Sequence, residues 1–529
     1  MNGPHAQDPH AQDPHPNNPH PQGPGRLAGP VSRRGFLGLS LAAASAAMLA
    51  ACTSPSPSGA TRVLSSDDAV RAAEAARPSS GRTVAARLDP APLTVTLDGK
   101  QVQTWGYNGT VNGPLLRGSV GDRLEVALAN GLPEPTVVHW HGLALANDQD
   151  GVEMLTQKEI AAGGSFGYGF RLAHPGTYWY HSHMELQRER GLYGPLIVDD
   201  PSEARDWDHE WVILLDDWMD GVTGTPEDVL NELSQGMGGM MGGRPGGQGG
   251  GRYMAMGSVS DYLGGDAGDV RYPLHLFNGR TPSDPDTLRA KAGDRVRLRI
   301  INAGGDTAYR VGAPGVKLTV THTDGFPVER TEADAVVLGM GERIDALLTV
   351  PEGWTPLMAQ PEGKTGLALG RISTGTGKEP IAAALPSRLT GTVVDGGQLT
   401  AAAGARLARR DPDRTHTVRL TGSMMAYDWG LDGRRFDMAN PYDGALEVRQ
   451  GERVRIDFVN ESMMWHPMHL HGHTFQVGDA GARKDTVIVR PGQTVSVLFD
   501  ADNPGQWLYH CHNAYHAARG MMGVLSYVR

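Results

Sequence analysis

Ten histidines and one cysteine of this chain fall into four short motifs with metal-binding spacing. The motifs are His139-Trp140-His141-Gly142, His181-Ser182-His183, His466-Pro467-Met468-His469-Leu470-His471, and His510-Cys511-His512 with His516 close behind. Side chains alternate across a β-strand, so the two histidines of an H-x-H triplet point to one face and the middle residue to the other. Both imidazoles of the last triplet therefore face away from the thiol of Cys511, and this one strand can join two metal sites.

The cysteine side of that triplet predicts a site for one copper ion. His466, Cys511 and His516 offer two imidazoles and a thiolate. A trigonal His2Cys set with a weak axial methionine is the blue-copper geometry, which suits electron transfer. Met521, five residues beyond His516, is the predicted axial residue, and Met522 takes that place only if the loop shifts by one.

The histidine side predicts a multinuclear copper cluster. Imidazole suits copper, and eight imidazoles exceed what one ion can bind. Each motif supplies two of them, so the front and back of the chain contribute equally and the cluster is expected at their interface. The eight are His139, His141, His181, His183, His469, His471, His510 and His512.

Three repeats of one strand pattern predict an all-β protein of three Greek-key β-sandwich domains. GDRLEVALAN begins at Gly121, GDRVRLRIIN at Gly293 and GERVRIDFVN at Gly451, each a Gly-acid turn followed by alternating apolar residues. Their spacing is typical of sandwich domains, and we predict domains at 83–200, 205–378 and 414–529, with a linker at 379–413. PGTYWYHSH and PGQWLYHCH link only the outer two repeats, so the middle domain is expected mostly to space them.

The motifs resemble the four copper signatures of three-domain multicopper oxidases, the family of laccases, ferroxidases and cuprous oxidases. The likeness runs from about residue 85 to the C-terminus and is closest to exported bacterial oxidases linked to copper tolerance. It implies three cupredoxin-like domains, four one-electron oxidations at a type 1 copper, and reduction of O2 to two waters at a trinuclear cluster. The implied ligands are His466, Cys511, His516 and Met521 for type 1 copper; His139 and His469 for type 2; and, for the type 3 pair, His141, His181 and His512 on one copper, with His183, His471 and His510 on the other.

Oxygen reduction consumes protons, so an acid is expected near the cluster. Asp150 occupies the position that the resemblance assigns to this acid, and an ordinary Asp-Gly turn is the alternative. Many bacterial relatives also have a carboxylate directly after the second type 1 histidine. This chain has Ala517 there, so their usual proton route is in doubt.

The N-terminus resembles an export signal. Residues 1–30 are His/Pro-rich, residues 32–37 read SRRGFL like a twin-arginine motif, and Leu49-Ala50-Ala51-Cys52 resembles a lipobox. We predict a signal at 1–52, a lipid anchor on Cys52, a tether at 53–82 and a location on the outer, periplasmic side of the cytoplasmic membrane. An ordinary signal with a chance cysteine is the alternative. The net charge of -11 disfavours nucleic-acid partners, and a monomer is expected.

The electron donor is the open question. A Met/Gly-rich insertion at 236–257 contains Met237, Met240 and Met241, and Met464 lies two residues before His466. Thioethers prefer Cu(I), which favours a Cu(I) oxidase with Fe(II) as a further substrate; disordered low-complexity sequence is the alternative for the insertion. A laccase-like oxidase of phenols would need an open cleft over His466 or His516. A non-catalytic copper-binding cupredoxin protein predicts missing ligands, and none is missing.

Overall fold

The computed structural model describes residues 60–237, 251–381 and 384–529, and these described residues belong to one compact unit. Strands dominate it, and three cupredoxin-like β-sandwiches follow one another along the chain, as predicted. The predicted signal with Cys52, and also Met240 and Met241, lie outside the described residues. No helix of the described residues is both long and apolar enough to span a membrane.

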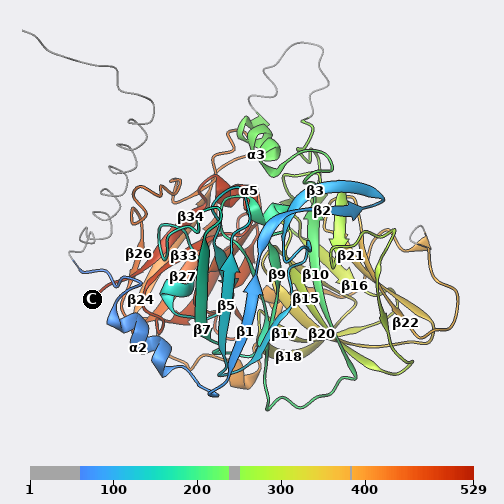
Figure 1. Ribbon diagram of the computed structural model, residues 1–529, viewed down its shortest axis with the longest axis horizontal. Helices are drawn as coiled ribbons and strands as arrows, with labels where there is room; N and C mark the ends of the chain where they lie inside the picture. The colour runs from blue at the N-terminus through green and yellow to red at the C-terminus, as the bar shows by residue number, and fades with distance from the viewer. Residues whose placement is uncertain (1–59, 238–250, 382–383) are drawn as a thin grey trace, which may run out of the picture. The chain divides into compact units, whose positions relative to one another are not determined.

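The first sandwich packs a three-stranded sheet, β1-β5-β7, against a four-stranded sheet, β4-β9-β8-β6. A hairpin of β2 and β3 reaches onto the second sandwich (Figure 1), where Leu97 and Val102 share one core with Leu214 and Trp218. The elements are α2 (Asp68–Ala76), β1 (Thr83–Leu88), β2 (Pro90–Leu97), β3 (Lys100–Tyr107), β4 (Leu116–Ser119), β5 (Arg123–Ala129), β6 (Val138–His141), η1 (Asn147–Gln149), β7 (Ser165–Arg171), β8 (Gly176–Ser182), η2 (Gln187–Arg190) and β9 (Tyr193–Asp199).

The second sandwich has two six-stranded sheets, β13-β10-β15-β20-β17-β18 and β14-β22-β21-β16-β19-β23, and a separate pair, β11-β12. Its elements are β10 (His209–Trp218), α3 (Pro226–Ser234), β11 (Val259–Ser260), β12 (Gly265–Asp266), β13 (Leu274–Phe277), β14 (Asp286–Arg289), β15 (Arg295–Asn302), β16 (Tyr309–Gly312), β17 (Leu318–Thr323), β18 (Phe326–Ala333), β19 (Ala335–Leu338), β20 (Arg343–Thr349), β21 (Trp354–Pro361), β22 (Ala368–Ser373), β23 (Val393–Asp395), η4 (Gly396–Gln398) and η5 (Ala403–Ala405).

The third sandwich has a six-stranded sheet, β25-β24-β27-β32-β29-β30, and a five-stranded sheet, β26-β34-β33-β28-β31. Its elements are β24 (Arg414–Thr421), β25 (Gly430–Leu431), β26 (Leu446–Val448), β27 (Arg453–Asn460), β28 (His466–Leu470), β29 (Phe475–Val477), β30 (Arg483–Lys484), β31 (Thr486–Val489), β32 (Thr494–Asp500), β33 (Gln506–Cys511), α5 (Ala514–Ala518) and β34 (Met522–Tyr527).

The three sandwiches repeat one topology. The repeated sequence motif forms β5, β15 and β27, and each of these strands pairs in parallel with the first strand of its sandwich, β1, β10 and β24 respectively. Along β5 the side chains alternate between exposed and buried, which is the pattern read from its sequence. The Gly-acid turn and the alternating residues therefore predicted the central strand of each repeat.

Two segments expected to be connecting chain are partly ordered structure. The predicted tether at 53–82 contains helix α2, whose Val70 is buried in the core of the first sandwich. The predicted linker at 379–413 contains β23, which pairs in parallel with β19 of the second sandwich. Ala/Gly-rich composition suggested a linker, but the small side chains of this segment, such as the fully buried Ala401, pack closely against neighbouring strands.

Candidate metal centres

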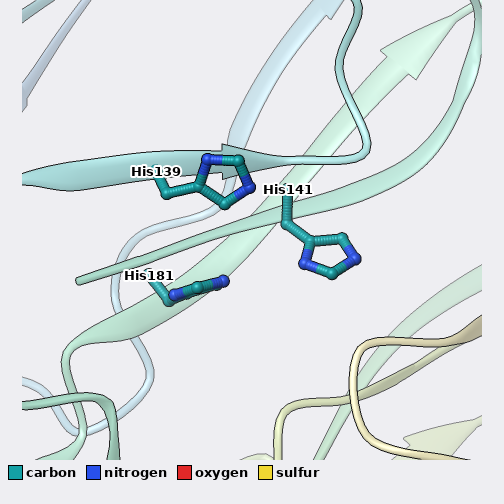
Figure 2. A group of neighbouring side chains, drawn as sticks. All are labelled: His139, His141 and His181. Atoms are coloured by element: carbon teal, nitrogen blue, oxygen red, sulfur yellow. The ribbon is translucent and has the colours of Figure 1, made fainter. Parts of the chain in front are cut away.

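Paired strands bring the motif histidines together. In the first sandwich β6 lies antiparallel to β8 with His139 opposite His181. In the third, β28 lies antiparallel to β33 with His469 opposite His510. Figure 2 shows the imidazoles of His139, His141 and His181 gathered beside one another from β6 and β8. Because each strand alternates its side chains, each H-x-H triplet presents both imidazoles to this common space.

All eight histidines predicted for the cluster lie in this space, between the first and third sandwiches. Three overlapping groups have ligand atoms within 4.8 Å of one another: His139 with His141 and His181, His139 with His469 and His471, and His183 with His471 and His510. His512 completes the set, with its ring centroid 4.9 Å from that of His141. Only His183 is more than marginally exposed, with 9% of its side chain accessible.

The site fits a metal cluster because several imidazole nitrogens have nothing else to bind. The buried atoms His139 Nε2, His141 Nδ1, His181 Nε2 and His469 Nε2 have no hydrogen-bond partner among the described residues. Such orphaned buried polar atoms are costly and rare. His471 Nε2 and His510 Nε2 also lie only 3.1 Å apart, an arrangement that a cation between them would stabilise.

The protonation of the histidines suits metal binding as well. Burial, which outweighs every other influence, lowers the pKa well below the ordinary value for five of the ligands. Neutral imidazole is the form that coordinates metal. The five are His141, His181, His471, His510 and His512.

Neighbouring acceptors set which nitrogen of each ring faces the cluster. Neutral histidine carries one N–H, and the nitrogen that does not carry it is free for a metal. Four rings place Nδ1 within 2.9 Å of a main-chain carbonyl oxygen, which leaves Nε2 toward the cluster. They are His139 at Asp150, His181 at Ser182, His469 at Asp485 and His510 at Cys511.

His141 is turned the other way. Its Nε2 lies 3.0 Å from Asp485 Oδ1 and 3.2 Å from Thr486 Oγ1, so Nδ1 is the free nitrogen. Asp485 is fully buried and receives two hydrogen bonds from Arg343 of the second sandwich, at 2.7 and 2.6 Å. Burial acts against its ionisation, but Arg343, together with His141 and His469, outweighs burial and holds the pKa of Asp485 well below its usual range. Neither Asp485 nor Arg343 lies in a copper motif, so the sequence pattern did not point to them.

Asp150, the predicted acid, lies against two of the cluster histidines. Its Oδ2 is 3.0 Å from His471 Nδ1, and its Oδ1 is 3.2 Å from His139 Nδ1. Its side chain is 1% exposed. An ordinary surface turn would leave the carboxylate in solvent, whereas this one bridges histidines from two sandwiches.

Cys511 faces the opposite side of β33, as the alternation predicts. Its Sγ lies 3.6 Å from Nδ1 of His466 and 3.6 Å from Nδ1 of His516, and these two nitrogens are 3.1 Å apart. All three side chains are fully buried. Met521 is also fully buried and its carbonyl oxygen accepts a hydrogen bond from the Cys511 amide, whereas Met522 lines a solvent cavity. These positions favour Met521 over Met522 as the axial residue.

The outer edges of His466 and His516, the histidines predicted for type 1 copper, are closed by the protein. Ser462 Oγ lies 2.8 Å from His466 Nε2, and Asp269 Oδ2 lies 3.0 Å from His516 Nε2 while accepting a hydrogen bond from Tyr427. Burial lowers the pKa of His516, but Asp269 and Cys511 outweigh burial and raise this pKa to about 10. Asp269 belongs to the middle domain, which therefore does more than space the outer two.

The methionines predicted to bind Cu(I) occupy different settings. Met464 is 1% exposed and packs in the core, whereas its neighbour Met463 is 82% exposed. Met237 follows α3, and its amide donates a hydrogen bond to the carbonyl oxygen of Met424. Both side chains pack against the hydrophobic core that contains Tyr427. Met424 and the exposed Met425 lie far from the Met/Gly-rich insertion in the chain, so the sequence pattern did not point to them.

A cavity of about 320 Å³ reaches the histidine cluster from solvent. It is lined by His183, His510 and Ala517, and by two acids, Glu153 and Glu185. The cluster can therefore exchange small molecules with solvent.

Comparison with known proteins identifies the family. Multicopper oxidase family models match residues 91–203, 209–356 and 409–528. Multicopper oxidase MmcO of Mycobacterium tuberculosis is 47% identical over 94% of this chain and 97% of its own length. The chain belongs to the multicopper oxidase family. It is an O2-dependent oxidoreductase whose cofactors are four copper ions: one type 1, one type 2 and a type 3 pair.

More distant relatives are similar in sequence or in fold. A copper resistance protein A homolog of Pseudomonas syringae pv. tomato is 28% identical over 81% of this chain and 89% of its own. The crystal structure of Fet3p, described as a multicopper oxidase that functions in iron import, superposes with a TM-score of 0.69 at 23% identity, covering 84% of this chain and 90% of that one. At that identity the likeness concerns the fold alone.

Proposed function

We propose that this multicopper oxidase oxidises Cu(I), and Fe(II) as a further substrate, with O2 as the electron acceptor. His466, Cys511, His516 and Met521 would hold type 1 copper, His139 and His469 type 2, and the other six histidines the type 3 pair, as the family pattern assigns them. When bound, the copper ions supply one-electron redox chemistry and the site of O2 reduction. Four electrons from four metal ions, four protons and one O2 give two waters.

The observation that carries the choice of substrate is the closure of His466 and His516. Both imidazoles are fully buried, and Ser462 and Asp269 occupy their outer nitrogens. A phenol would need a cleft against one of these edges. Electrons need only a short path through covalent and hydrogen bonds, so a metal ion held at Asp269 or Tyr427 could donate through His516 without touching it.

Sulfur donors near this path support Cu(I) as the ion. Met237 and Met424 are joined by a main-chain hydrogen bond, and Tyr427, three residues after Met424, donates to Asp269. Met425 is 55% exposed and could receive an ion from solvent. Thioethers are soft ligands that select Cu(I) over harder ions.

The ordered part of the insertion holds Asp269 in place. Glu232 of α3 accepts hydrogen bonds from the amides of Tyr253 and Met254. Met254 pairs with Val270, and the amide of Ala255 donates to the carbonyl oxygen of Asp269 at 2.7 Å. Deleting the whole of 236–257 would thus displace Asp269 as well as remove sulfur, so single substitutions are the sharper test.

On the oxygen side, the residues of the cluster have distinct tasks. Cys511, the last residue of β33, lies between His510 and His512 in the chain, so this stretch of backbone is the shortest covalent path between the two copper sites. Asp150 contacts two of the cluster histidines, and we assign it the delivery of protons beside His471. Asp485 and Arg343 fix the ring of His141.

The relatives support a role in copper tolerance. Copper resistance protein A of Escherichia coli is 27% identical over 81% of this chain, and Laccase-1 of Cryptococcus neoformans is 28% identical over 83%. Because of the similarity to this laccase, phenol oxidation is the alternative function. We further propose export by the twin-arginine route and anchoring through Cys52, which would place the enzyme where it meets copper outside the cytoplasm.

Oxygen uptake by the copper-loaded enzyme with Cu(I), Fe(II) and a phenol in parallel tests the proposal. The Met237→Leu, Met424→Leu double variant removes two sulfurs with little change in volume, and Met358→Leu, in the core of the second sandwich, is the matched control. We expect kcat/KM for Cu(I) to fall in the double variant while the phenol rate is unchanged. If phenol turnover far exceeds Cu(I) turnover and the double variant oxidises Cu(I) normally, the enzyme is a laccase.

A further inference from the structure

The cavity that reaches the cluster has an unusual arrangement of acids. The residue directly after His516 is Ala517, which lines this cavity without a carboxylate. The carboxylates that line it instead are Glu153 and Glu185. Only Glu153 contacts a cluster histidine, with its Oε2 3.3 Å from His183 Nδ1.

His183 differs from the other cluster histidines in what holds its ring. His139, His181, His469 and His510 are held at Nδ1 by main-chain carbonyl oxygens, and His471 is held by the buried Asp150. His183 lies at the cavity wall and is the most exposed of the eight. Among the described residues, its one hydrogen-bond partner is Glu153.

The loop that carries Glu153 is tightly fixed. The next residue, Met154, has a φ of 65°, a left-handed conformation that is uncommon for a side chain of this kind. The Met154 amide donates to the Gln157 carbonyl oxygen, and the Thr156 hydroxyl contacts both the amide and the carbonyl of Val152. Strained backbone of this sort persists only where surrounding contacts enforce it, and it often marks a functional position.

We propose that Glu153 is a positioning residue for His183. Its carboxylate accepts the hydrogen bond from Nδ1, which fixes the tautomer and the ring angle and leaves Nε2 directed to the type 3 pair. Metal-bound histidines commonly rely on such a carboxylate partner. Glu153 thereby does for His183, from the solvent side, what main-chain carbonyls do for the deeper ligands. This role concerns the cluster alone and holds whichever electron donor the enzyme uses.

Four variants test the role of Glu153. Glu153→Ala removes the acceptor, Glu153→Asp keeps the charge but draws the carboxylate back, and Glu153→Gln keeps an acceptor oxygen at the same reach. Glu185→Ala removes the other acid of the same cavity and is the matched control. In the part of the chain that the structure describes, the Glu185 side chain contacts none of the cluster histidines. The readouts are copper retention against a chelator, the type 3 absorption band, and the EPR signal that an uncoupled type 3 copper would produce.

The expected pattern separates positioning from charge. Glu153→Ala and Glu153→Asp should weaken copper retention at the type 3 pair by about 10- to 100-fold, with an unchanged blue band showing that the third domain is folded. Glu153→Gln and Glu185→Ala should resemble the wild type. The proposal is overturned if Glu153→Ala retains an intact type 3 pair, if Glu153→Gln fails as Glu153→Ala does, or if Glu185→Ala loses copper equally.

Discussion

The two sides of β33 differ in how they meet solvent. On one side, His183 and His510 line a cavity of about 320 Å³. On the other, the side chains of His466, Cys511 and His516 are fully buried. Cys511 borders the same cavity, but neither His466 nor His516 does, and Ser462 and Asp269 contact their outer ring nitrogens. The difference follows from what each site exchanges. O2 and water must reach the cluster as molecules, whereas electrons can pass through the protein to a buried site.

Removing the thiol should have the largest effect, because it breaks the link between the two sides. Cys511→Ser should abolish the blue band and stop O2 uptake with every donor. The eight cluster histidines remain, so the type 2 EPR signal should persist. Absorption, EPR and copper analysis check this, and a blue Cys511→Ser protein would contradict the site assignment.

The second-largest effect should come from removing Asp485, the buried carboxylate that contacts His141. Asp485→Ala removes the closer of the two buried carboxylates beside Arg343 and leaves only Asp324, at 3.6 Å; breaking a buried ion pair in this way costs about 3–5 kcal/mol of the free energy of unfolding. It also frees His141 to turn, so type 3 copper should be lost. Urea unfolding measures the first effect. Glu461→Ala, which breaks an exposed pair with Arg419, is the control and should change stability by less than about 1 kcal/mol; equal losses would mean that Asp485 has no special role.

Removing Asp269, which covers the outer nitrogen of His516, should change which electron donor the enzyme prefers. Asp269→Ala uncovers His516 Nε2 and should lower Cu(I) turnover about tenfold or more, while phenol turnover falls less or rises. Asp269→Asn keeps an acceptor oxygen and should lie between the two. The ratio of kcat/KM values for phenol and Cu(I) is the measure; an unchanged ratio in Asp269→Ala would remove Asp269 from the donor path.

The smallest effect concerns Glu189, a buried acid next in sequence to a residue that contacts the cluster. Glu189 accepts a hydrogen bond from Tyr272, and its neighbour Arg188 lies 2.9 Å from His512 Nδ1. Burial first, and then the nearby Asp217, raises the pKa of Glu189 from 4.5 to about 8. A raised acid pKa means that the folded state favours the neutral form. The contribution of Glu189 to the free energy of unfolding is therefore complete below about pH 4.5 and is lost as the pH rises through about 8.

Glu189→Gln stays neutral at every pH. Because wild-type Glu189 loses its contribution at high pH, the Tm of Glu189→Gln should match that of the wild type at about pH 5 and exceed it at about pH 9. Thermal unfolding at the two pH values measures the difference. Glu461→Gln, at the exposed surface, should show no such trend, and a constant Tm difference for Glu189→Gln would show that Glu189 is not a buried, protonated acid.

Local spacing made the ligand positions predictable. The alternation of side chains along a strand is a property of the backbone, so H-x-H and H-C-H fixed which side chains share a face. The repeated Gly-acid turn likewise located β5, β15 and β27. Both signals lie within about ten residues, which is a range that sequence patterns cover.

The partners of the ligands could not be predicted in this way. Asp269 lies 247 residues from His516, and Arg343 lies 142 residues from Asp485. Both come from the middle domain, whose sequence carries no copper motif, and only the packing of sandwiches brings them to the ligands. Helix α2 was missed for a related reason, since its stability depends on burying Val70 against a distant core.

The most direct test of the account isolates electron donation from O2 reduction. Under anaerobic conditions, the copper-loaded enzyme is mixed with Cu(I) or with a phenol of similar reduction potential, and bleaching of the blue band is followed by stopped flow. A sealed His516 with sulfur donors nearby predicts that Cu(I) bleaches the band at least about tenfold faster, the size of effect expected when one ligand partner controls access. Bleaching by the phenol at the same rate or faster would contradict the account.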